Sequence, residues 1–261
     1  MSKTPSLPKI KASDLLSELG VTDPKDLSNI EEICHSQGIE LKYENLETSE
    51  GRIIFGKDKN TIIVKKNEKY PQRERFTIAH ELGHFFLHKS LLGDKSCTTR
   101  DMFSWSTLGT RNLESEANEF AGEFLIPSQF IRPIAEDSPV TYELAGTISK
   151  QFGSSLTSSI LRHLEVTKYA SSVIFYSKDK VLYYRRSQPM IDMYLFPTID
   201  KFSPYSEASK VYSYLEEPKA NVIFPESWFD KNLDKYTVRE QANFFPQLNL
   251  GISIINLKLK S

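Results

Sequence analysis

The chain has little cysteine and tryptophan, and it contains no long apolar run. Its 261 residues include only 2 cysteines and 2 tryptophans. Cys34 and Cys97 stand in unlike surroundings, so the sequence predicts neither a disulfide framework nor a cysteine zinc site. No stretch reaches the roughly 20 apolar residues of a membrane-spanning helix, and the opening MSKTPSLPKIKASD lacks the apolar core of a signal peptide. We therefore expect a cytoplasmic protein with no membrane association.

An excess of charge of either sign is also missing. The chain has 33 Lys and Arg against 34 Asp and Glu, a formal net charge of -1. This balance gives no general attraction for nucleic acid or acidic membranes, so such binding would need a local patch, and none is evident. Hydrophobic residues make up 39% of the chain, which suits a folded protein with real cores and excludes a largely disordered one. The length favours two or three folded units.

Apolar periodicity predicts an α+β arrangement that opens with small helices and a small sheet. After a loose leader to about residue 12, helical spacing predicts two short helices within residues 14–38. Three strands follow in ELKYENL, GRIIFG and NTIIVKK, which are rich in Ile, Val and Tyr and separated by polar turns. A long helix then begins at Pro71, and a second strong helix is predicted in NLESEANEFAGEFL.

The connection between these helices and the end of the chain are less regular. The loop 89–111 contains Met102, Phe103 and Trp105, which either cover a site or fill a small core of their own. From residue 172 onward, SVIFYS, KVLYYRR and GISIINLKL predict strands, and EASKVYSYLEE predicts a helix. The aromatic residues between Phe175 and Phe196 either line a ligand pocket or pack in the core, and their strand spacing favours the core.

The stretch AHELGHFFLH, residues 79–88, carries the strongest chemical signal in the chain. His80 and His84 are four residues apart, so on a helix both imidazoles turn to the same side. With Glu81 they form the HExxH arrangement, in which two histidines bind zinc and the glutamate acts as general base. We predict His80 and His84 as zinc ligands and Glu81 as the catalytic base. The alternative is a pair of buried histidines satisfied by other partners.

His88 continues the four-residue series, but geometry argues against it as the third ligand. Eight residues at a rise of about 1.5 Å place it about 12 Å along the helix from His80, too far for bonds near 2 Å. We therefore interpret His88 as a helix-end residue that supports the site from outside. His35 and His163 are interpreted as ordinary polar positions.

The third ligand is expected from the helix NLESEANEFAGEFL. At about 100° per residue, Glu116, Glu119 and Glu123 share one side, which predicts a solvated acidic face, whereas Glu114 stands alone on the opposite flank. Glu114 is therefore predicted as the third ligand, and Glu116 is the alternative. Asn118, one turn further on, is predicted to hydrogen-bond a ligand rather than bind the metal.

With these residues in place, the chain resembles the ImmA/IrrE family of metallopeptidases. RERFTIAHELGHFFLH, ESEANEFAGEFLIP and the strand pair GRIIFGKDKNTIIV bear the resemblance, over roughly residues 25–135. In related peptidases the third ligand opens a Glu-x-x-x-Asp/Asn segment, which Glu114 to Asn118 matches. The resemblance implies a selective endopeptidase that cleaves a helix-turn-helix repressor and so switches on mobile-element or stress-response genes.

The resemblance also implies an order of domains. It predicts a leader and helix at 1–24, a zincin-like metallopeptidase domain at 25–138, a helix-turn-helix-like segment at 139–168, and a small C-terminal α/β domain at 169–261. The last is similar to a GAF-type sensor, which implies a small-molecule or signal ligand. The strand Thr61 to Val64 is either an ordinary interior strand or an exposed edge that pairs with substrate.

Two points stay open in this interpretation. Zinc is favoured because two imidazoles and a carboxylate leave a fourth position free, but manganese or iron suit the same ligands. The alternative function is a non-catalytic regulator that binds DNA or a protein partner on the same scaffold. The helix-turn-helix-like segment carries only Lys150, Arg162 and Lys168 as basic residues, a thin surface for phosphate contacts, so DNA binding is disfavoured.

Overall fold

The structure is a computed structural model that describes residues 4–47, 49–89, 95–97, 113–178, 180–198, 205–211 and 218–260, with the backbone alone at 95–97. The chain divides into two compact units. The first comprises Met1–Pro127 with Lys150–Ser155, and the second comprises Ser128–Ser149 with Leu156–Ser261. Helices and two separate sheets confirm the predicted mixed α+β class.

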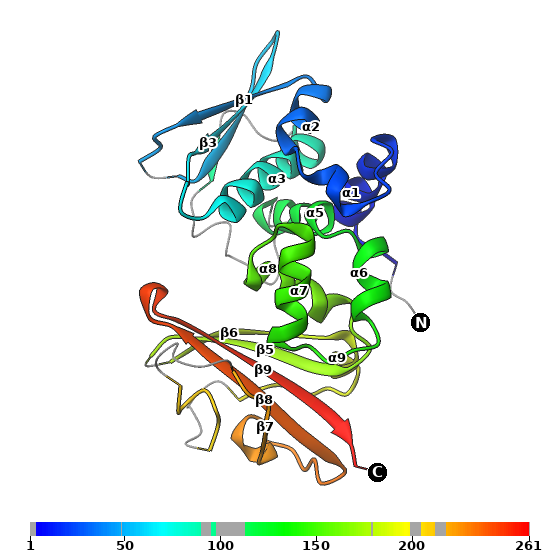
Figure 1. Cartoon of the computed structure of the whole chain (residues 1–261), viewed down its shortest axis with the longest axis vertical. Helices are drawn as coiled ribbons and strands as arrows, with labels where there is room; N and C mark the ends of the chain where they lie inside the picture. The colour runs from blue at the N-terminus through cyan, green and yellow to red at the C-terminus, as the bar shows by residue number, and fades with distance from the viewer. Residues whose placement is uncertain are drawn as a thin grey trace. The chain divides into compact units, whose positions relative to one another are not determined.

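The first unit is built around a four-stranded sheet in the order β1-β3-β2-β4 (Figure 1). β1 (Ile39–Glu44) runs parallel to β3 (Asn60–Lys65), and β2 (Gly51–Phe55) runs antiparallel to both β3 and β4 (Lys95–Cys97). β3 is therefore hydrogen-bonded on both sides, and its Ile62, Ile63 and Val64 are buried. Of the two alternatives for Thr61 to Val64, the structure agrees with the interior strand and contradicts the exposed edge that pairs with substrate, because β1 is paired along that edge.

Four α-helices of the first unit lie against this sheet and each other. α3 (Pro71–His88) packs on β2 and β3, and its closest helical neighbour is α5 (Leu113–Leu125). α1 (Leu7–Glu18) packs on α5, and α2 (Ile30–Ser36) packs on β1 and α3. Figure 1 shows α3 and α5 side by side beneath the sheet, so the sheet, α3 and α5 form successive layers.

The N-terminal segment is more ordered than the sequence indicated. Residues 7–12, predicted to belong to a loose leader, form the first turns of α1. Pro8 lies in the first turn, where a missing backbone N–H and a fixed φ do not oppose a helix. Ala12, Leu15 and Leu16 are buried, so α1 is held by its packing against α5 and α3.

The second unit combines short helices with a five-stranded antiparallel sheet in the order β6-β5-β9-β8-β7. α8 packs on α6, β5 and β6. α7 belongs to the second unit up to Ser149, and its end from Lys150 onward belongs to the first unit. The helix expected at 207–217 is absent from its described part, because residues 207–211 form a bend and a turn, and the remainder lies outside the described residues. The elements are α6 (Ser128–Ala135), α7 (Tyr142–Phe152), α8 (Leu156–Val166), α9 (Gln188–Asp192), β5 (Ala170–Tyr176), β6 (Val181–Arg186), β7 (Asn221–Ile223), β8 (Tyr236–Phe245) and β9 (Leu250–Leu259), with short 3-10 turns at Pro24–Leu27, Pro225–Ser227 and Pro246–Leu248.

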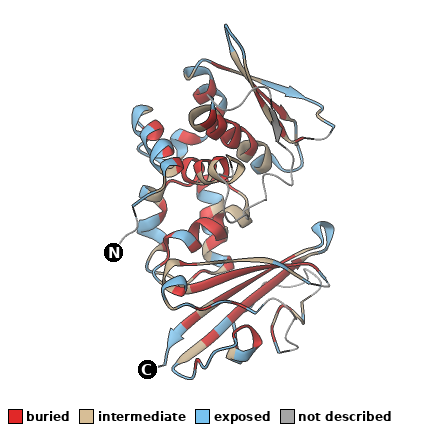
Figure 2. Cartoon of the chain, turned by 180° about the vertical axis from the view of Figure 1, so that it is seen from behind, coloured by how far each residue is buried: buried red, intermediate tan, exposed pale blue. Residues whose placement is uncertain are grey.

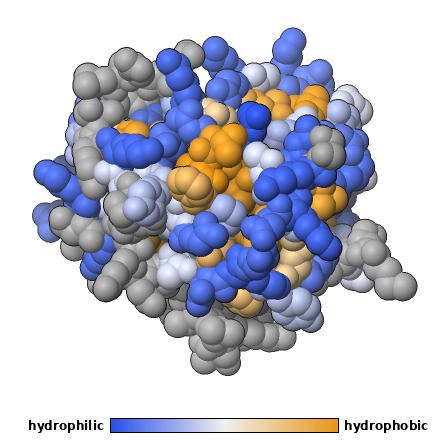
Figure 3. All heavy atoms as spheres, turned by 90° about the horizontal axis from the view of Figure 1, so that it is seen from below, coloured by the Kyte–Doolittle hydropathy of each residue, from blue (hydrophilic) through white to orange (hydrophobic). Residues whose placement is uncertain are grey.

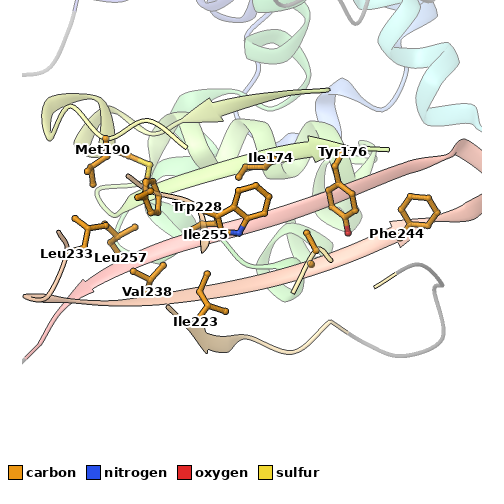
Figure 4. Packing of buried hydrophobic residues seen from close by; sticks show 14 residues of the cluster. Ile174, Tyr176, Met190, Ile223, Trp228, Leu233, Val238, Phe244, Ile255 and Leu257 are labelled. Carbon is orange, nitrogen blue, oxygen red and sulfur yellow. The ribbon is translucent and has the colours of Figure 1, made fainter. Parts of the chain in front are cut away.

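One face of the second sheet is covered by a hydrophobic cluster (Figure 4). Trp228 and Tyr176 are its largest fully buried side chains, and they lie among aliphatic residues of β5 and β9. The expectation that strand-spaced aromatics form core is confirmed for Phe175 and Tyr176, which are buried, whereas Tyr194 and Phe196 are exposed. The buried aromatic rings show that this sheet has a core of its own.

The surface carries both apolar and hydrophilic side chains. Figure 3 shows apolar side chains gathered near the middle of one face, with hydrophilic side chains around them. In the second unit, Tyr205, Val222 and Phe224 are exposed, and the rings of Tyr205 and Phe224 meet with centroids 6.2 Å apart. Among the described residues, no helix has both the length and the apolar character needed to cross a bilayer.

Candidate metal centre

Helix α3 presents the HExxH residues from a buried surface. Pro71 occupies its first turn, and the helix continues without interruption to His88. Every residue from Thr77 to His84 is buried, as the red middle of α3 in Figure 2 shows. Burial on all sides is unusual for polar side chains, so the two histidines and Glu81 require specific partners.

Gly83 brings α3 close to α5. A Cβ atom at this position would lie 3.0 Å from both Cα and the carbonyl oxygen of Ala117 and 3.2 Å from Cβ of Phe120. The two backbones therefore approach each other more closely than a side chain at position 83 ordinarily allows. This approach brings the first turn of α5, which carries Glu114, beside His80 and His84.

Three donor atoms converge between these helices. Nε2 of His80 lies 3.1 Å from one carboxylate oxygen of Glu114, and Nε2 of His84 lies 3.4 Å from the other. The two Nε2 atoms are 3.0 Å apart. Among the described residues, His80, His84 and Glu114 form the group of His, Cys, Asp and Glu side chains whose ligand atoms lie within 4.8 Å of one another.

The orientation of His80 suits a metal ligand. Its Nδ1 lies 3.0 Å from Oδ1 of Asn118, which is fully buried. An amide oxygen only accepts, so Nδ1 of His80 carries the proton and its Nε2 presents a lone pair to His84 and Glu114. Asn118 therefore contacts His80 through the ring nitrogen that does not face His84 and Glu114.

The separations of the donor atoms fit a small divalent cation. Ligands at about 2.05 Å from a tetrahedral ion lie about 3.3 Å from one another, close to the observed separations between the three donors. Two imidazole nitrogens with facing lone pairs repel each other unless a proton or a cation lies between them. The three residues therefore fit a metal bound by two nitrogens and one or two carboxylate oxygens.

The carboxylate of Glu114 is held in its charged form. Burial opposes its ionisation, but the imidazoles of His80 and His84, when they carry protons on Nε2, outweigh burial and hold the pKa of Glu114 well below its ordinary value, and a bound cation would take the place of these protons. An anionic carboxylate next to two imidazoles is the charge arrangement that a divalent cation requires.

Glu81 is fully buried and faces the sheet rather than solvent. On β2, a Cβ atom at Gly51 would lie 3.1 Å from Oε1 of Glu81 and 2.5 Å from Cγ2 of Thr77. Gly51 therefore leaves the space in which the Glu81 carboxylate lies. Glu81 follows His80 directly in the chain, so its carboxylate is anchored to the same turn of α3 that presents the first histidine.

The other glutamates of α5 do not form the predicted solvated face. Glu123 is 3% exposed, and Glu116 lies with Oε2 3.0 Å from Nε2 of His88. The carboxylate of Glu119 lies 3.8 Å from Nζ of Lys9, and its side chain is 32% exposed, as is that of Glu116. The reason is that α1 and α3 both pack on α5 and so cover more of its circumference than one apolar stripe.

Glu116, the alternative third ligand, is therefore placed beside His88 and outside the group of three donors. His88 itself is 1% exposed, and its Nδ1 lies 3.0 Å from Nδ1 of His84. Burial lowers the pKa of His88, while its hydrogen bond to Glu116 acts in the opposite direction. The four-residue series in AHELGHFFLH signalled the contact with His84, but no sequence signal pointed to Glu116 as the partner of His88.

The remaining histidines lie elsewhere. His163 on α8 is fully buried, not an ordinary polar position, and its Nε2 donates to the carbonyl oxygens of Ala135 and Ser138. His35 is exposed near the end of α2. The residues of loop 89–111 singled out in the sequence, Met102, Phe103 and Trp105, lie outside the described residues.

A helix pair that brings an HExxH motif and a glutamate together against a mixed sheet defines a metallopeptidase-like domain. Comparison with known proteins gives the same class, since residues 34–162 match the family of IrrE N-terminal-like domains. Metallopeptidase ImmA of Bacillus subtilis (strain 168) is 32% identical over 104 residues, which cover 40% of this chain and 57% of ImmA. These matches assign residues 34–162 to the ImmA/IrrE family of metallopeptidases.

A solved structure supports the fold over a longer range. A Mycobacterium tuberculosis transcriptional regulator aligns with a TM-score of 0.61 at 15% identity, covering 96% of this chain and 87% of that chain. At this identity the likeness concerns the fold alone. The chain spans little more than half the length of ImmA, and that alignment covers less than half of this chain.

Proposed function

We propose that the chain is a zinc-dependent endopeptidase. His80, His84 and Glu114 hold the ion, and Glu81 is the general base. The observation that carries the proposal is the convergence of two imidazole nitrogens and a charged carboxylate within 3.0 to 3.4 Å of one another. Manganese or iron suit the same donors, but nitrogen-rich sites of this size favour zinc.

The residues divide the chemistry among them. When bound, the ion polarises the scissile carbonyl and lowers the pKa of a bound water to about 7. Glu81 takes the proton of the attacking water on its carboxylate and delivers it to the nitrogen of the leaving amine. Asn118 holds the ring of His80 in the tautomer that leaves Nε2 bare.

Metal content and cleavage test this proposal together. Wild type is expected to hold about one zinc per chain, and His84→Ala to hold none. Glu81→Gln is expected to keep the zinc and lose cleavage, because an amide accepts no proton from water. Glu119→Gln makes the same change at a surface position of α5 and is expected to change neither. Wild type without metal after reconstitution would refute the proposal.

The proposed substrate is a helix-turn-helix transcriptional repressor, as the family resemblance implies. The transcriptional regulator whose fold the chain shares agrees with a role in gene control. Candidate repressors encoded near this gene can be incubated with wild type and with Glu81→Gln, and the fragments identified by mass spectrometry. One discrete cut made by wild type alone would support the assignment, and uniform digestion of unrelated proteins would contradict it.

The alternative, a regulator that binds DNA, has less support in the segment predicted to bind it. α8, its second helix, is covered by α6, β5 and β6. Arg162 is buried and paired with Glu165, while Nζ of Lys168 lies 3.1 Å from Glu136 and 2.9 Å from Asp137. Two of the three basic residues are therefore already neutralised. Salt-dependent binding to duplex DNA near physiological ionic strength would reverse this preference.

A sensor role for the C-terminal unit is the remaining part of the proposal. Its support is the likeness of the sequence order to family members with a GAF-type domain, together with exposed aromatic side chains such as Tyr205 and Phe224. Thermal shift with a panel of nucleotides and aromatic metabolites tests it. A melting temperature unchanged by every compound would leave the peptidase proposal intact and remove the sensor.

A further inference from the structure

His88 connects His84 with Glu116, two residues that have no link in the proposed catalytic reaction. It is the last residue of α3, it is 1% exposed, and both of its ring nitrogens have partners. Its Nδ1 lies 3.0 Å from Nδ1 of His84, and its Nε2 lies 3.0 Å from Oε2 of Glu116. A continuous chain of hydrogen bonds therefore runs from α5 through the end of α3 to the second histidine of the motif.

The direction of these hydrogen bonds follows from the chemistry at each end. Nε2 of His84 points at His80 and Glu114, so as a ligand it is bare and the proton of His84 lies on Nδ1. That N–H donates to Nδ1 of His88, which must accept and therefore carries its own proton on Nε2. The Nε2–H of His88 donates to Glu116, whose carboxylate only accepts. With the proton of His84 on Nδ1 and that of His88 on Nε2, both contacts of the His88 ring are hydrogen bonds.

Glu116 has a second effect through its place in the chain. It lies in the first turn of α5, two residues after Glu114. Its contact with His88 ties this turn to the last turn of α3, beside the donor atoms. The same contact that orients His84 therefore also limits how far Glu114 can move away from the two histidines.

We infer that His88 and Glu116 are positioning residues of the metal centre, which select the Nδ1–H tautomer of His84 and hold the first turn of α5 in place. This inference rests on the proposed function, because it assigns His80, His84 and Glu114 as ligands. It gives the two histidines different supports: Asn118 acts directly on His80, whereas His84 is supported through a second histidine. Partners of this kind typically change metal affinity by about 10-fold to 100-fold.

Two substitutions of His88 separate its two contacts. His88→Asn keeps an acceptor at the position of Nδ1 and loses the reach to Glu116. His88→Gln keeps a donor at the position of Nε2 and loses the acceptor that faces His84. We expect His88→Gln to weaken zinc binding by about 10-fold to 100-fold and His88→Asn to weaken it clearly less. The affinities are measured by competition with a chromophoric zinc chelator.

A matched pair of substitutions on α5 tests whether the charge of the Glu116 carboxylate contributes to zinc binding. Glu116→Gln keeps an acceptor for His88 but removes the charge, so we expect a loss of affinity of a few-fold. Glu119→Gln makes the same change one turn away, where the carboxylate lies near Lys9, and it is expected to bind zinc as wild type does. The melting temperature of each metal-free variant shows separately how much folding stability has changed.

Proton NMR reads the tautomer itself. With 5 histidines in the chain, ¹⁵N-histidine labelling yields few enough imidazole signals to assign. In zinc-loaded wild type and in His88→Asn, the Nδ1–H of His84 is expected as a downfield signal protected from exchange with water. In His88→Gln the signal is expected to be lost to exchange. A role in packing alone would not produce this difference between the two variants.

The outcomes separate the inference from the proposed function. If wild type binds no zinc, the metal site fails and the inference fails with it. If wild type binds zinc and both His88 variants bind it equally well, only the inference is wrong. If both variants lose affinity and metal-free stability to the same extent, His88 serves packing and the tautomer argument is overturned. Weaker binding in His88→Gln than in His88→Asn, with similar metal-free melting temperatures, supports the inference.

Discussion

Replacing Gly83 by alanine tests how closely the two helices of the site must approach. The new methyl group would lie 3.0 Å from Cα and from the carbonyl oxygen of Ala117 and 3.2 Å from Cβ of Phe120. Carbon atoms in good contact lie about 3.5–4.0 Å apart, so α5 must move away from α3 by roughly a few tenths of an ångström. The backbone of Ala117 cannot yield by rotating a side chain, so the helix itself must shift.

The change in folding stability caused by Gly83→Ala is the sum of two opposing contributions. Alanine in place of glycine stabilises the interior of a helix by about 1 kcal/mol, whereas overpacking a buried contact typically costs about 1–3 kcal/mol. We expect a net loss of up to about 2 kcal/mol in the first unit. Metal–ligand distances normally lie within about 0.2 Å of their ideal values, and Glu114 lies one turn from Ala117, so we expect zinc affinity to fall by about 10-fold.

Gly146→Ala is the matched control. Gly146 also lies within a helix, α7, but a Cβ atom there meets nothing within 4 Å. This variant is expected to gain up to about 1 kcal/mol of stability and to bind zinc as wild type does. Zinc affinity comes from chelator competition, and amide hydrogen exchange reports the stability of α3 and α5 separately. If Gly83→Ala binds zinc as tightly as Gly146→Ala, the argument from close approach is refuted.

Three further predictions concern other buried groups. Gly51→Ala should slow cleavage while zinc is retained, because its methyl group would press on the Glu81 carboxylate. Burial raises the pKa of Cys34 to about 12. In a Cys97→Ser variant, a thiol reagent at pH 8 should therefore label Cys34 only as the protein unfolds. Rapid labelling of the folded protein would contradict this prediction. Burial also raises the pKa of Glu240, so the contribution of Glu240 to folding stability should be complete below about pH 4.5 and should decline as the pH rises. In denaturant titrations, Glu240→Gln should remove that decline.

The sequence predicted the helices of the site better than it predicted their surroundings. Local signals suffice for α3 and α5, since Pro71 opens the first and Ile126-Pro127 stops the second. The three strands before them were also found, because β-branched residues and polar turns mark them locally. Their order was not predictable from such signals, because the pairing of β1 with β3 depends on a crossover rather than on either strand alone.

In the second unit, too, local sequence signals predicted some strands and missed another. The strands at 170–176, 181–186 and 250–259 carry dense apolar residues and were expected, whereas β8 (Tyr236–Phe245) was not. β8 contains Arg239, Glu240, Gln241 and Asn243, a composition that is uncommon in strands. Glu240 is buried nonetheless, because its carboxylate accepts hydrogen bonds from the backbone N–H groups of Glu207 and Ala208 and from the hydroxyl of Ser253. These partners lie far away in sequence.

The choice of Glu114 over Glu116 shows what a helical wheel can and cannot decide. The wheel separated Glu114 from the other glutamates, since that separation depends only on about 100° per residue, and the structure places Glu114 with His80 and His84. It then treated the other side as solvated, which assumes that one face of a helix meets protein and the other meets water. α5 has α3 on one side and α1 on another, so Glu116 also faces protein and contacts His88. Two glutamates two residues apart thus have distinct proposed roles, one at the metal and one at the histidine behind it, and only tertiary packing distinguishes them.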